Sequence, residues 1–238
     1  KSSAAVPTKA GERAAAAGRA WLGRGFFAPD DLAHLVKHRN LRPAYVPMWV
    51  FEATLTARWS AQVAEGYGRT RQWVHRTGEH ALFFRDHLQP ATRALPADLL
   101  QRLPAFDLKK LLAFKPEYLA EWPAALYDIS LADASLNARA AMVKEAGGQV
   151  LAKLQSGREV RDLQVSTDLF SGELFQLVLL PLWVGTYTYR GRLYRLLVNG
   201  QTGAVAGDKP VDGVKVVLVA AGAMLIAAFL LYLLYFFG

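Results

Sequence analysis

The sequence contains no cysteine among its 238 residues. This absence excludes a disulfide framework, and in a chain of this size it favours a reducing compartment over a secreted one. Residues 1–20 are rich in alanine and basic residues but contain no continuous apolar run, so we expect no signal peptide. Both absences favour a cytoplasmic location for the soluble part.

Several catalytic signatures are also missing. The sequence has no Gly-x-x-x-x-Gly-Lys-Ser/Thr phosphate loop, no Gly-x-Ser-x-Gly nucleophile elbow and no His-Glu-x-x-His motif. The pairs Ser156-Gly157 and Ser171-Gly172 are typical of turns, and Asn199-Gly200 is typical of a hairpin. We therefore predict no catalytic residue and no cofactor within this chain. An enzyme with an unrecognised site is the alternative.

Charge is absent from residues 216–238, which contain no Asp, Glu, Lys, Arg or His. At about 1.5 Å per residue, a helix of this length spans the roughly 30 Å hydrocarbon core of a bilayer. Its final residues, which include Tyr232, Tyr235 and Phe237, are the aromatic residues that favour the far interface. The sequence predicts one transmembrane helix that starts at Val216 and includes Phe237, against the alternative of a buried helix.

Every charge lies in residues 1–215, which therefore carry the whole net charge of +8. Lys209 and Lys215 lie on the N-terminal side of the anchor, so the positive-inside rule predicts a domain that faces the cytoplasm. We expect a single-pass, tail-anchored protein of the inner membrane, with the basic domain attracted to anionic lipid. Nucleic acid is the less favoured partner for this charge.

The first part of the chain predicts helices followed by a strand. Residues 11–25 favour a helix after a linker, and Pro29-Asp30-Asp31 favours a second helix start. Alternation then predicts a strand over 44–61, with these residues on one face: Trp49, Phe51, Ala53, Leu55, Ala57 and Trp59. Residues 70–77 and 79–86 predict two further strands around Gly78.

Five prolines between residues 88 and 130 break any long element there. We predict short helices at 97–102 and 107–113, and a strand near 126–131. The longest soluble helix is expected over 133–156, with a bend at Gly147-Gly148. The remaining strands are predicted at 163–170, 173–189, 192–198 and 204–206, with a hairpin at Asn199-Gly200.

One short motif occurs twice: Val46-Pro47-Met48-Trp49-Val50 and Leu180-Pro181-Leu182-Trp183-Val184. Each copy follows a predicted helix and precedes predicted strands. We therefore predict an α+β fold of two similar halves, each a helix packed on an antiparallel meander, comparable to cystatin or PepSY modules by analogy only. The expected boundaries are 1–25 (linker and helix), 26–131 (first half), 132–208 (second half), 209–215 (juxtamembrane linker) and 216–238 (anchor). The alternative is a chance match between unrelated strands.

Several segments carry a family resemblance. They are Phe26–Leu32, Leu41–Phe51, Leu180–Val184 and Tyr194–Gly203. They resemble an uncharacterised family of bacterial zinc-ribbon membrane proteins, often labelled as similar to the primosomal protein N′ helicase. The resemblance implies a zinc ribbon with four cysteine ligands, which this chain lacks, so we expect any zinc in a segment ahead of Lys1. Helicase activity is not expected, because the phosphate loop is missing.

Histidines and tryptophans offer weaker candidates for sites. His34 and His38 lie four apart on a predicted helix and could ligate a metal, although exposed or partner-binding histidines are the simpler interpretation. His75, His80 and His87 could gather near the meander. The tryptophans at 49, 59, 73, 122 and 183 are expected to be core or sheet residues, with a partner-binding groove as the alternative.

Five arginines concentrate positive charge in one region: Arg69, Arg71, Arg76, Arg85 and Arg93. A solvated face is the simplest interpretation, and contact with anionic lipid or an acidic partner is the sharper one. The sequence therefore predicts a membrane-anchored interaction or scaffold module that holds a protein partner at the membrane. The alternatives are an enzyme or a membrane-localised nucleic-acid-binding protein.

Overall fold

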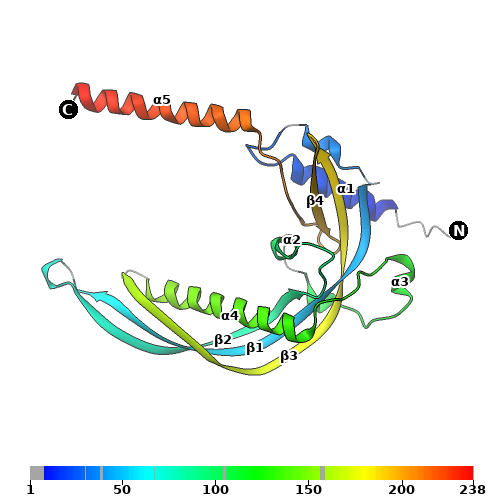
Figure 1. The fold of residues 1–238 in the computed structure, drawn as a ribbon, viewed down its shortest axis with the longest axis horizontal. Helices are drawn as coiled ribbons and strands as arrows, with labels where there is room; N and C mark the ends of the chain where they lie inside the picture. The colour runs from blue at the N-terminus through cyan, green and yellow to red at the C-terminus, as the bar shows by residue number, and fades with distance from the viewer. Residues whose placement is uncertain are drawn as a thin grey trace. The chain divides into compact units, whose positions relative to one another are not determined.

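The computed structural model describes residues 8–29, 31–37, 40–66, 68–103, 106–155 and 159–237. The fold is α+β, with one five-stranded sheet in the order β2-β1-β3-β4-β5 (Figure 1). The pairings of β1 with β2, of β3 with β4 and of β4 with β5 are antiparallel. The helices are α1 (Thr8–Leu22), α2 (Ala97–Arg102), α3 (Tyr118–Glu121), α4 (Leu131–Leu154) and α5 (Gly213–Phe237). The strands are β1 (Leu41–Glu65), β2 (Gln72–Pro90), β3 (Val160–Tyr189), β4 (Arg192–Asn199) and β5 (Val205–Gly207).

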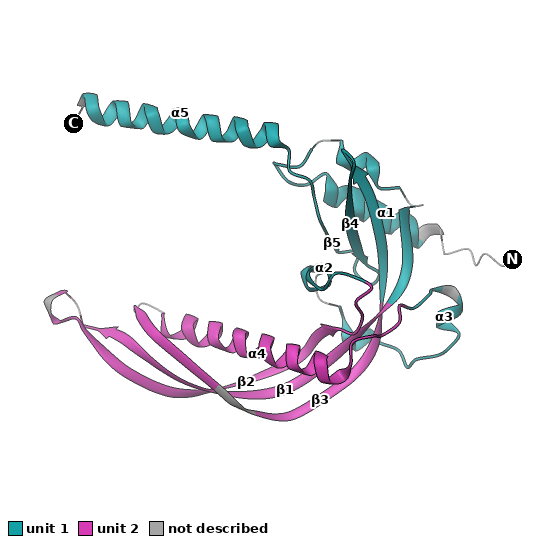
Figure 2. Cartoon of the chain, in the orientation of Figure 1, with its two compact units in different colours: residues 1–45, 95–124, 181–238 teal, residues 46–94, 125–180 magenta. Residues whose placement is uncertain are grey.

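The chain forms two compact units that interleave along the sequence (Figure 2). Unit 1 comprises residues 1–45, 95–124 and 181–238, and unit 2 comprises residues 46–94 and 125–180. Strand β1 begins in unit 1 and continues in unit 2, whereas β3 begins in unit 2 and ends in unit 1. The structure therefore does not show the two repeated halves that were predicted over 26–131 and 132–208. The physical reason is that β1 and β3 each belong to both units.

Unit 1 has its core between α1, the short 3-10 helix η1 (Leu32–Leu35) and the strands β3 and β4. Fully buried side chains from these elements include Leu22, Leu32, Leu196 and Val198. Helix α1 contacts β4, and Leu41 of β1 belongs to the same core. The helix predicted over 11–25 is confirmed, and in the structure it spans Thr8–Leu22. The segment predicted to start a helix at Pro29 forms only the short η1, and Asp30 lies outside the described residues.

Unit 2 consists of three long strands that curl around α4 (Figure 1). Alternate β1 residues from Phe51 to Ala57 are buried, and they pack on the α4 residues Ala134, Ala138, Met142 and Ala146. This four-residue spacing places the mostly small α4 side chains on one face, which lets the helix approach the sheet closely. The predicted alternation over 44–61 and the predicted helix over 133–156 are thus confirmed.

Two predicted turns lie inside continuous strands. Gly78 was predicted to separate two strands, but β2 runs through it, and Gly78 pairs with Trp59 on β1. A Cβ atom at position 78 would lie 2.7 Å from Cζ2 of Trp59, so the glycine makes room for the indole. Gly172 was also predicted as a turn, but it lies within β3 in a left-handed conformation with φ of 62°.

The Pro-rich segment is partly as predicted. Helix α2 confirms the short helix at 97–102, whereas 107–113 forms only the 3-10 helix η4 (Leu108–Lys110). The strand predicted near 126–131 is wrong, because this stretch is irregular until α4 begins. The hairpin prediction at Asn199-Gly200 is confirmed, since β4 and β5 pair around it. There Asn199 Oδ1 accepts hydrogen bonds from the N–H groups of Gln201 and Thr202 at 2.9 and 3.1 Å.

Candidate functional site

The C-terminal helix α5 is the most distinctive candidate for a functional element. The helical segment 213–236 is long and apolar enough to cross a membrane. No residue in its most apolar part is buried in the structure. Val216 is 41 % exposed and Leu225 is 73 % exposed, although both are apolar. The side chain of Phe237 lies outside the described residues. An isolated helix with this apolar surface requires an apolar environment, and lipid supplies one.

The linker ahead of α5 is bonded to unit 1. The Lys209 ammonium group donates to the carbonyl oxygens of Trp21 and Arg24 at 2.5 and 2.7 Å. These two carbonyls lie at and just beyond the C-terminal end of α1, where the helix dipole makes a cation favourable. The Trp21 carbonyl also accepts from the Arg24 N–H at 3.1 Å. Burial lowers the pKa of Lys209, and the charge of Arg24 lowers it further.

A second group of bonds holds the start of the linker. Arg102 Nη2 contacts a carboxylate oxygen of Asp208 at 2.8 Å, and its Nη1 donates to the Gly207 carbonyl at 3.1 Å. The Tyr187 hydroxyl donates to the Asp208 carbonyl oxygen at 2.6 Å. Burial raises the pKa of Tyr187, so this hydroxyl keeps its proton and remains a donor. Asp208 is thus held at its carboxylate by Arg102 and at its backbone carbonyl by Tyr187.

The last part of the linker is bonded to the segment after α1. The Asp212 N–H donates to the Phe27 carbonyl at 2.8 Å, and the Lys215 ammonium group donates to the Ala28 carbonyl at 2.9 Å. Asp212 also accepts a bond from the Val214 N–H at 3.0 Å, as a helix N-cap residue does. We call the bonded residues Asp208, Lys209, Asp212 and Lys215 the collar. The collar residues join the start of α5 to the rest of unit 1.

Sequence reasoning found the two collar lysines but missed their partners. Lys209 and Lys215 were singled out for charge, and the structure adds backbone carbonyls of residues 21, 24 and 28 as their acceptors. Arg102 and Asp208 are 106 residues apart in sequence. No local pattern links positions so far apart, and backbone carbonyl acceptors have no residue-type signal at all.

Two of the four predicted arginines whose side chains the structure describes are paired with acidic side chains. Arg71 forms an ion pair with Glu159, and Arg76 forms one with Glu65 at 2.6 Å. Arg93 donates from its backbone N–H to the Asp128 carboxylate at 2.7 Å. Arg85 lies 5.2 Å from the centroid of the Phe83 ring, and the side chain of Arg69 lies outside the described residues. These pairings reduce the positive field that the sequence alone predicted.

The predicted histidines do not gather into a metal site in the described part of the chain. No group of three or more His, Asp or Glu side chains with metal-binding geometry occurs there. His34 is exposed on η1, and His38 lies outside the described residues. His75 pairs with Gln62 and His80 with Ala57, at separate places along β2.

His87 is the histidine with a distinctive environment. It is half-buried, and its Nε2 lies 2.9 Å from the side-chain nitrogen of Gln89, which is itself buried. Burial lowers the pKa of His87, and the charge of Glu145 opposes this in part. His87 is therefore favoured in its neutral form inside unit 2.

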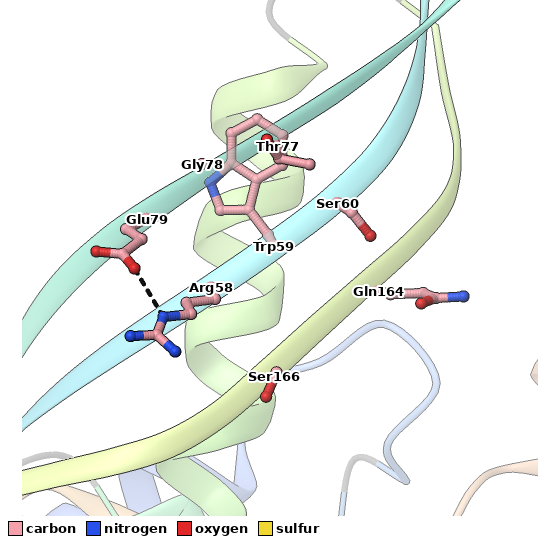
Figure 3. Close-up of a pocket in the computed structure, with 8 residues that line it drawn as sticks. All are labelled: Arg58, Trp59, Ser60, Thr77, Gly78, Glu79, Gln164 and Ser166. Atoms are coloured by element: carbon pink, nitrogen blue, oxygen red, sulfur yellow. Dashed lines mark hydrogen bonds and ion pairs between the residues drawn. The ribbon is translucent and has the colours of Figure 1, made fainter.

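A groove of about 400 Å³ lies on the unit 2 sheet (Figure 3). It is lined by Arg58, Trp59, Ser60, Thr77, Gly78, Glu79, Gln164 and Ser166. Arg58 and Glu79 form an ion pair at 2.7 Å across its floor, shown as a dashed line in Figure 3. The lining supplies hydroxyl and amide groups for hydrogen bonding. Glu79, the acidic group among these lining residues, is already bonded to Arg58.

The repeated motif has the same local hydrogen bond in both copies. The Ala91 N–H donates to the Pro47 carbonyl at 3.1 Å, and the Gly200 N–H donates to the Pro181 carbonyl at 2.9 Å. Each donor follows the last residue of the partner strand, β2 or β4. Both copies lie where a long strand passes from one unit to the other.

The tryptophans are largely structural. Trp183 is buried, with its ring 5.2 Å from the ring of Trp122. The half-buried Trp49 donates from Nε1 to the Ile129 carbonyl at 3.1 Å. Trp73 is the exception, because it is 36 % exposed and lies under the guanidinium groups of Arg71 and Arg161 at 5.7 and 4.1 Å.

Comparison with known proteins gives one distant relationship to a bacterial protein. The chain is 24 % identical over 212 residues to the uncharacterized protein YdjG of Bacillus subtilis (strain 168). The match covers 83 % of this chain and 60 % of that relative, so the chain spans less than two thirds of the relative's length. No family model matches the chain, and no solved structure matches it. The relationship is one of distant homology to YdjG.

Proposed function

We propose that this protein is a membrane-anchored interaction module that holds a protein partner at the cytoplasmic face of the inner membrane. The observation that carries the proposal is α5, which is long and apolar enough to cross a bilayer. Its most apolar part is not buried in the structure. Lys209 and Lys215 precede it, and by the positive-inside rule they favour a cytoplasmic domain. The net charge of +8 adds attraction to anionic lipid.

The partner surface that we propose lies on β2. This strand is at one edge of the sheet, so one row of its backbone groups has no neighbouring strand in the sheet. Phe83 is 57 % exposed beside Arg85, and Trp73 is exposed beside Arg71. Aromatic and arginine side chains are enriched in protein interfaces, and an edge strand can accept a strand from a partner. We call Trp73, Phe83 and Arg85 the β2 surface.

Two finer proposals follow from the sequence. The shared hydrogen bond at Pro47 and Pro181 supports a repeat based on β1 and β3, the two strands that begin in one unit and end in the other. The resemblance to zinc-ribbon membrane proteins supports zinc binding by a segment outside this chain, because the chain contains no cysteine. Metal analysis of the longest natural form of the protein, with and without that segment, tests the second proposal.

The anchor and its orientation are tested in cells. Membranes are extracted with alkaline carbonate, and intact cells are treated with protease added to the outer face. We expect the protein to stay in the membrane pellet and residues 1–208 to be protected. Release into the supernatant would contradict the anchor, and digestion from outside would contradict the orientation.

The β2 surface is tested by photo-crosslinking from position 83 in membranes, followed by mass spectrometry. Position 193 is the matched control, because Leu193 is 63 % exposed on β4. We expect a discrete protein adduct from position 83 that is lost when Arg85 is exchanged for Glu. Equal adducts from both positions would contradict a partner site on β2. Substrate turnover at the groove of Figure 3 would favour the enzyme alternative.

A further inference from the structure

Two phenylalanines occupy the tip of a tight turn directly after α1. The Ala28 N–H donates to the Gly25 carbonyl at 3.1 Å, which places Phe26 and Phe27 at the two central positions of this turn. Gly25 has φ of 113°, a conformation that suits glycine. Phe26 is 73 % exposed and Phe27 is 42 % exposed, with their ring centroids 5.3 Å apart. An aromatic pair at a turn tip is unfavourable in water.

The same turn is bonded to the residues that begin α5. The Phe27 carbonyl accepts from the Asp212 N–H at 2.8 Å, and the Ala28 carbonyl accepts from the Lys215 ammonium group at 2.9 Å. Helix α5 starts at Gly213, so the turn touches the chain within one residue of that start. Whatever surface α5 enters therefore lies next to the phenylalanine pair.

The surroundings of the turn match a membrane interface. The neighbouring residues Val211 in the linker and Val214 in the first turn of α5 are 67 % and 65 % exposed, which extends the apolar surface. Arg24 and the collar lysines supply positive charge at the same place. Basic side chains beside exposed aromatic and aliphatic groups are the combination that binds the boundary between headgroups and acyl chains.

We propose that the turn Gly25–Ala28 is a second membrane contact, with Phe26 and Phe27 inserted among phospholipid headgroups beside α5. This inference rests on the proposed anchor and adds to it. A single helix leaves a domain free to rotate above the bilayer, whereas a second contact held by the collar fixes how unit 1 faces the lipid. The occupant of the apolar patch is the phospholipid bilayer itself.

The test uses the full chain in nanodiscs that contain phosphatidylglycerol and phosphatidylethanolamine. Because the chain has no cysteine, Phe26→Cys provides a unique site for an environment-sensitive NBD label. The matched control is Leu112→Cys, since Leu112 is 77 % exposed and also belongs to unit 1. We expect blue-shifted emission at position 26 and at least a twofold stronger quenching by headgroup-region spin-labelled lipid than at position 112.

The outcomes separate this inference from the anchor. A chain that fails to enter nanodiscs contradicts the anchor, whereas a chain that enters with position 26 as water-exposed as position 112 overturns the second contact. Should Phe26→Cys unfold unit 1, the unmodified chain is crosslinked to a photoactivatable phospholipid and digested. Adducts within residues 25–28 support the contact, and adducts confined to α5 overturn it. Position 26 could also stay exposed to water in nanodiscs and become shielded only in native membranes. That result would assign the patch to a protein partner and overturn the proposal.

Discussion

The ammonium nitrogen of Lys209 lies 4.0 Å from the centroid of the Trp21 ring while it donates to the Trp21 carbonyl oxygen. One side chain thus joins the linker to α1 by a cation–π contact and by hydrogen bonds. A cation in this position combines a ring face with carbonyl oxygens at the C-terminal end of a helix, and both interactions strengthen when water is partly excluded.

Exchanging Lys209 for Met tests this contact. Methionine keeps most of the apolar stem but removes the charge and the donors, so we expect a loss of about 1–3 kcal/mol in unfolding free energy. Chemical denaturation of the full chain in detergent, followed by tryptophan fluorescence, measures it. Lys144→Met is the control, because Lys144 is exposed on α4. An equal effect of both substitutions would show that the linker is not held through Lys209.

Gly78→Ala tests the packing of Trp59 against β2. The added Cβ would lie 2.7 Å from Cζ2 of Trp59, so the indole must shift, at a cost of about 1–3 kcal/mol. Gly147→Ala is the control, since nothing lies within 4 Å of its Cβ, and in a helix it should gain about 0.5–1 kcal/mol. The double variant Gly78→Ala with Trp59→Leu should recover part of the loss. No difference between the two alanine variants would refute this account of Gly78.

Trp49→Phe tests the hydrogen bond from Nε1 to the Ile129 carbonyl, which measures 3.1 Å. Phenylalanine retains ring contacts near Tyr127 and Phe175, so the loss should be about 1 kcal/mol, close to the value of one hydrogen bond. Urea denaturation monitored by circular dichroism gives the free energy. If Trp49→Phe were neutral while Trp49→Leu was costly, the ring and not the hydrogen bond would hold this end of β1.

His87 makes unit 2 sensitive to acid. Burial lowers the pKa of His87 below its usual 6.5, so below that pH the unfolded chain binds a proton more readily than the folded chain. The contribution of His87 to stability is therefore present above about pH 6.5 and is lost as the pH falls below it. We expect His87→Gln to flatten the fall in melting temperature between pH 7.5 and pH 5.5. The exposed His75→Gln should keep the profile of the unmodified protein, and an unchanged profile in His87→Gln would refute the role of His87.

Local patterns in the sequence predicted elements whose physics is local. The alternation around Leu55, the apolar spacing of α4 and the Asn199 turn each depend on residues close in the chain, and all three are present in the structure. The apolar stretch after Val216 likewise forms the predicted helix. These features depend on side-chain period and turn chemistry, which a sequence displays directly.

Features that depend on distant residues could not be predicted. Gly78 was interpreted as a turn because its partner Trp59 is recognisable only once β1 and β2 are in register. The arginine set was interpreted as a positive face because the pairing of Arg71 with Glu159 joins residues 88 apart. The two consecutive halves predicted from the sequence are not shown by the structure, because β1 and β3 each continue from one compact unit into the other.

The interleaving of the two units has a consequence for the order in which the chain is made. The residues of α1 are translated early, but their core partners on β4, such as Leu196, follow only after all of unit 2 has been synthesised. Unit 2 is complete at Leu180, before unit 1 has its last strands. The apolar face of α1, which includes Ala14, Ala15 and Leu22, therefore has only its nearby partners, such as Leu32 and Val36, until β4 has been synthesised. A chain built in this way leaves the core of unit 1 incomplete until its last strands have been made.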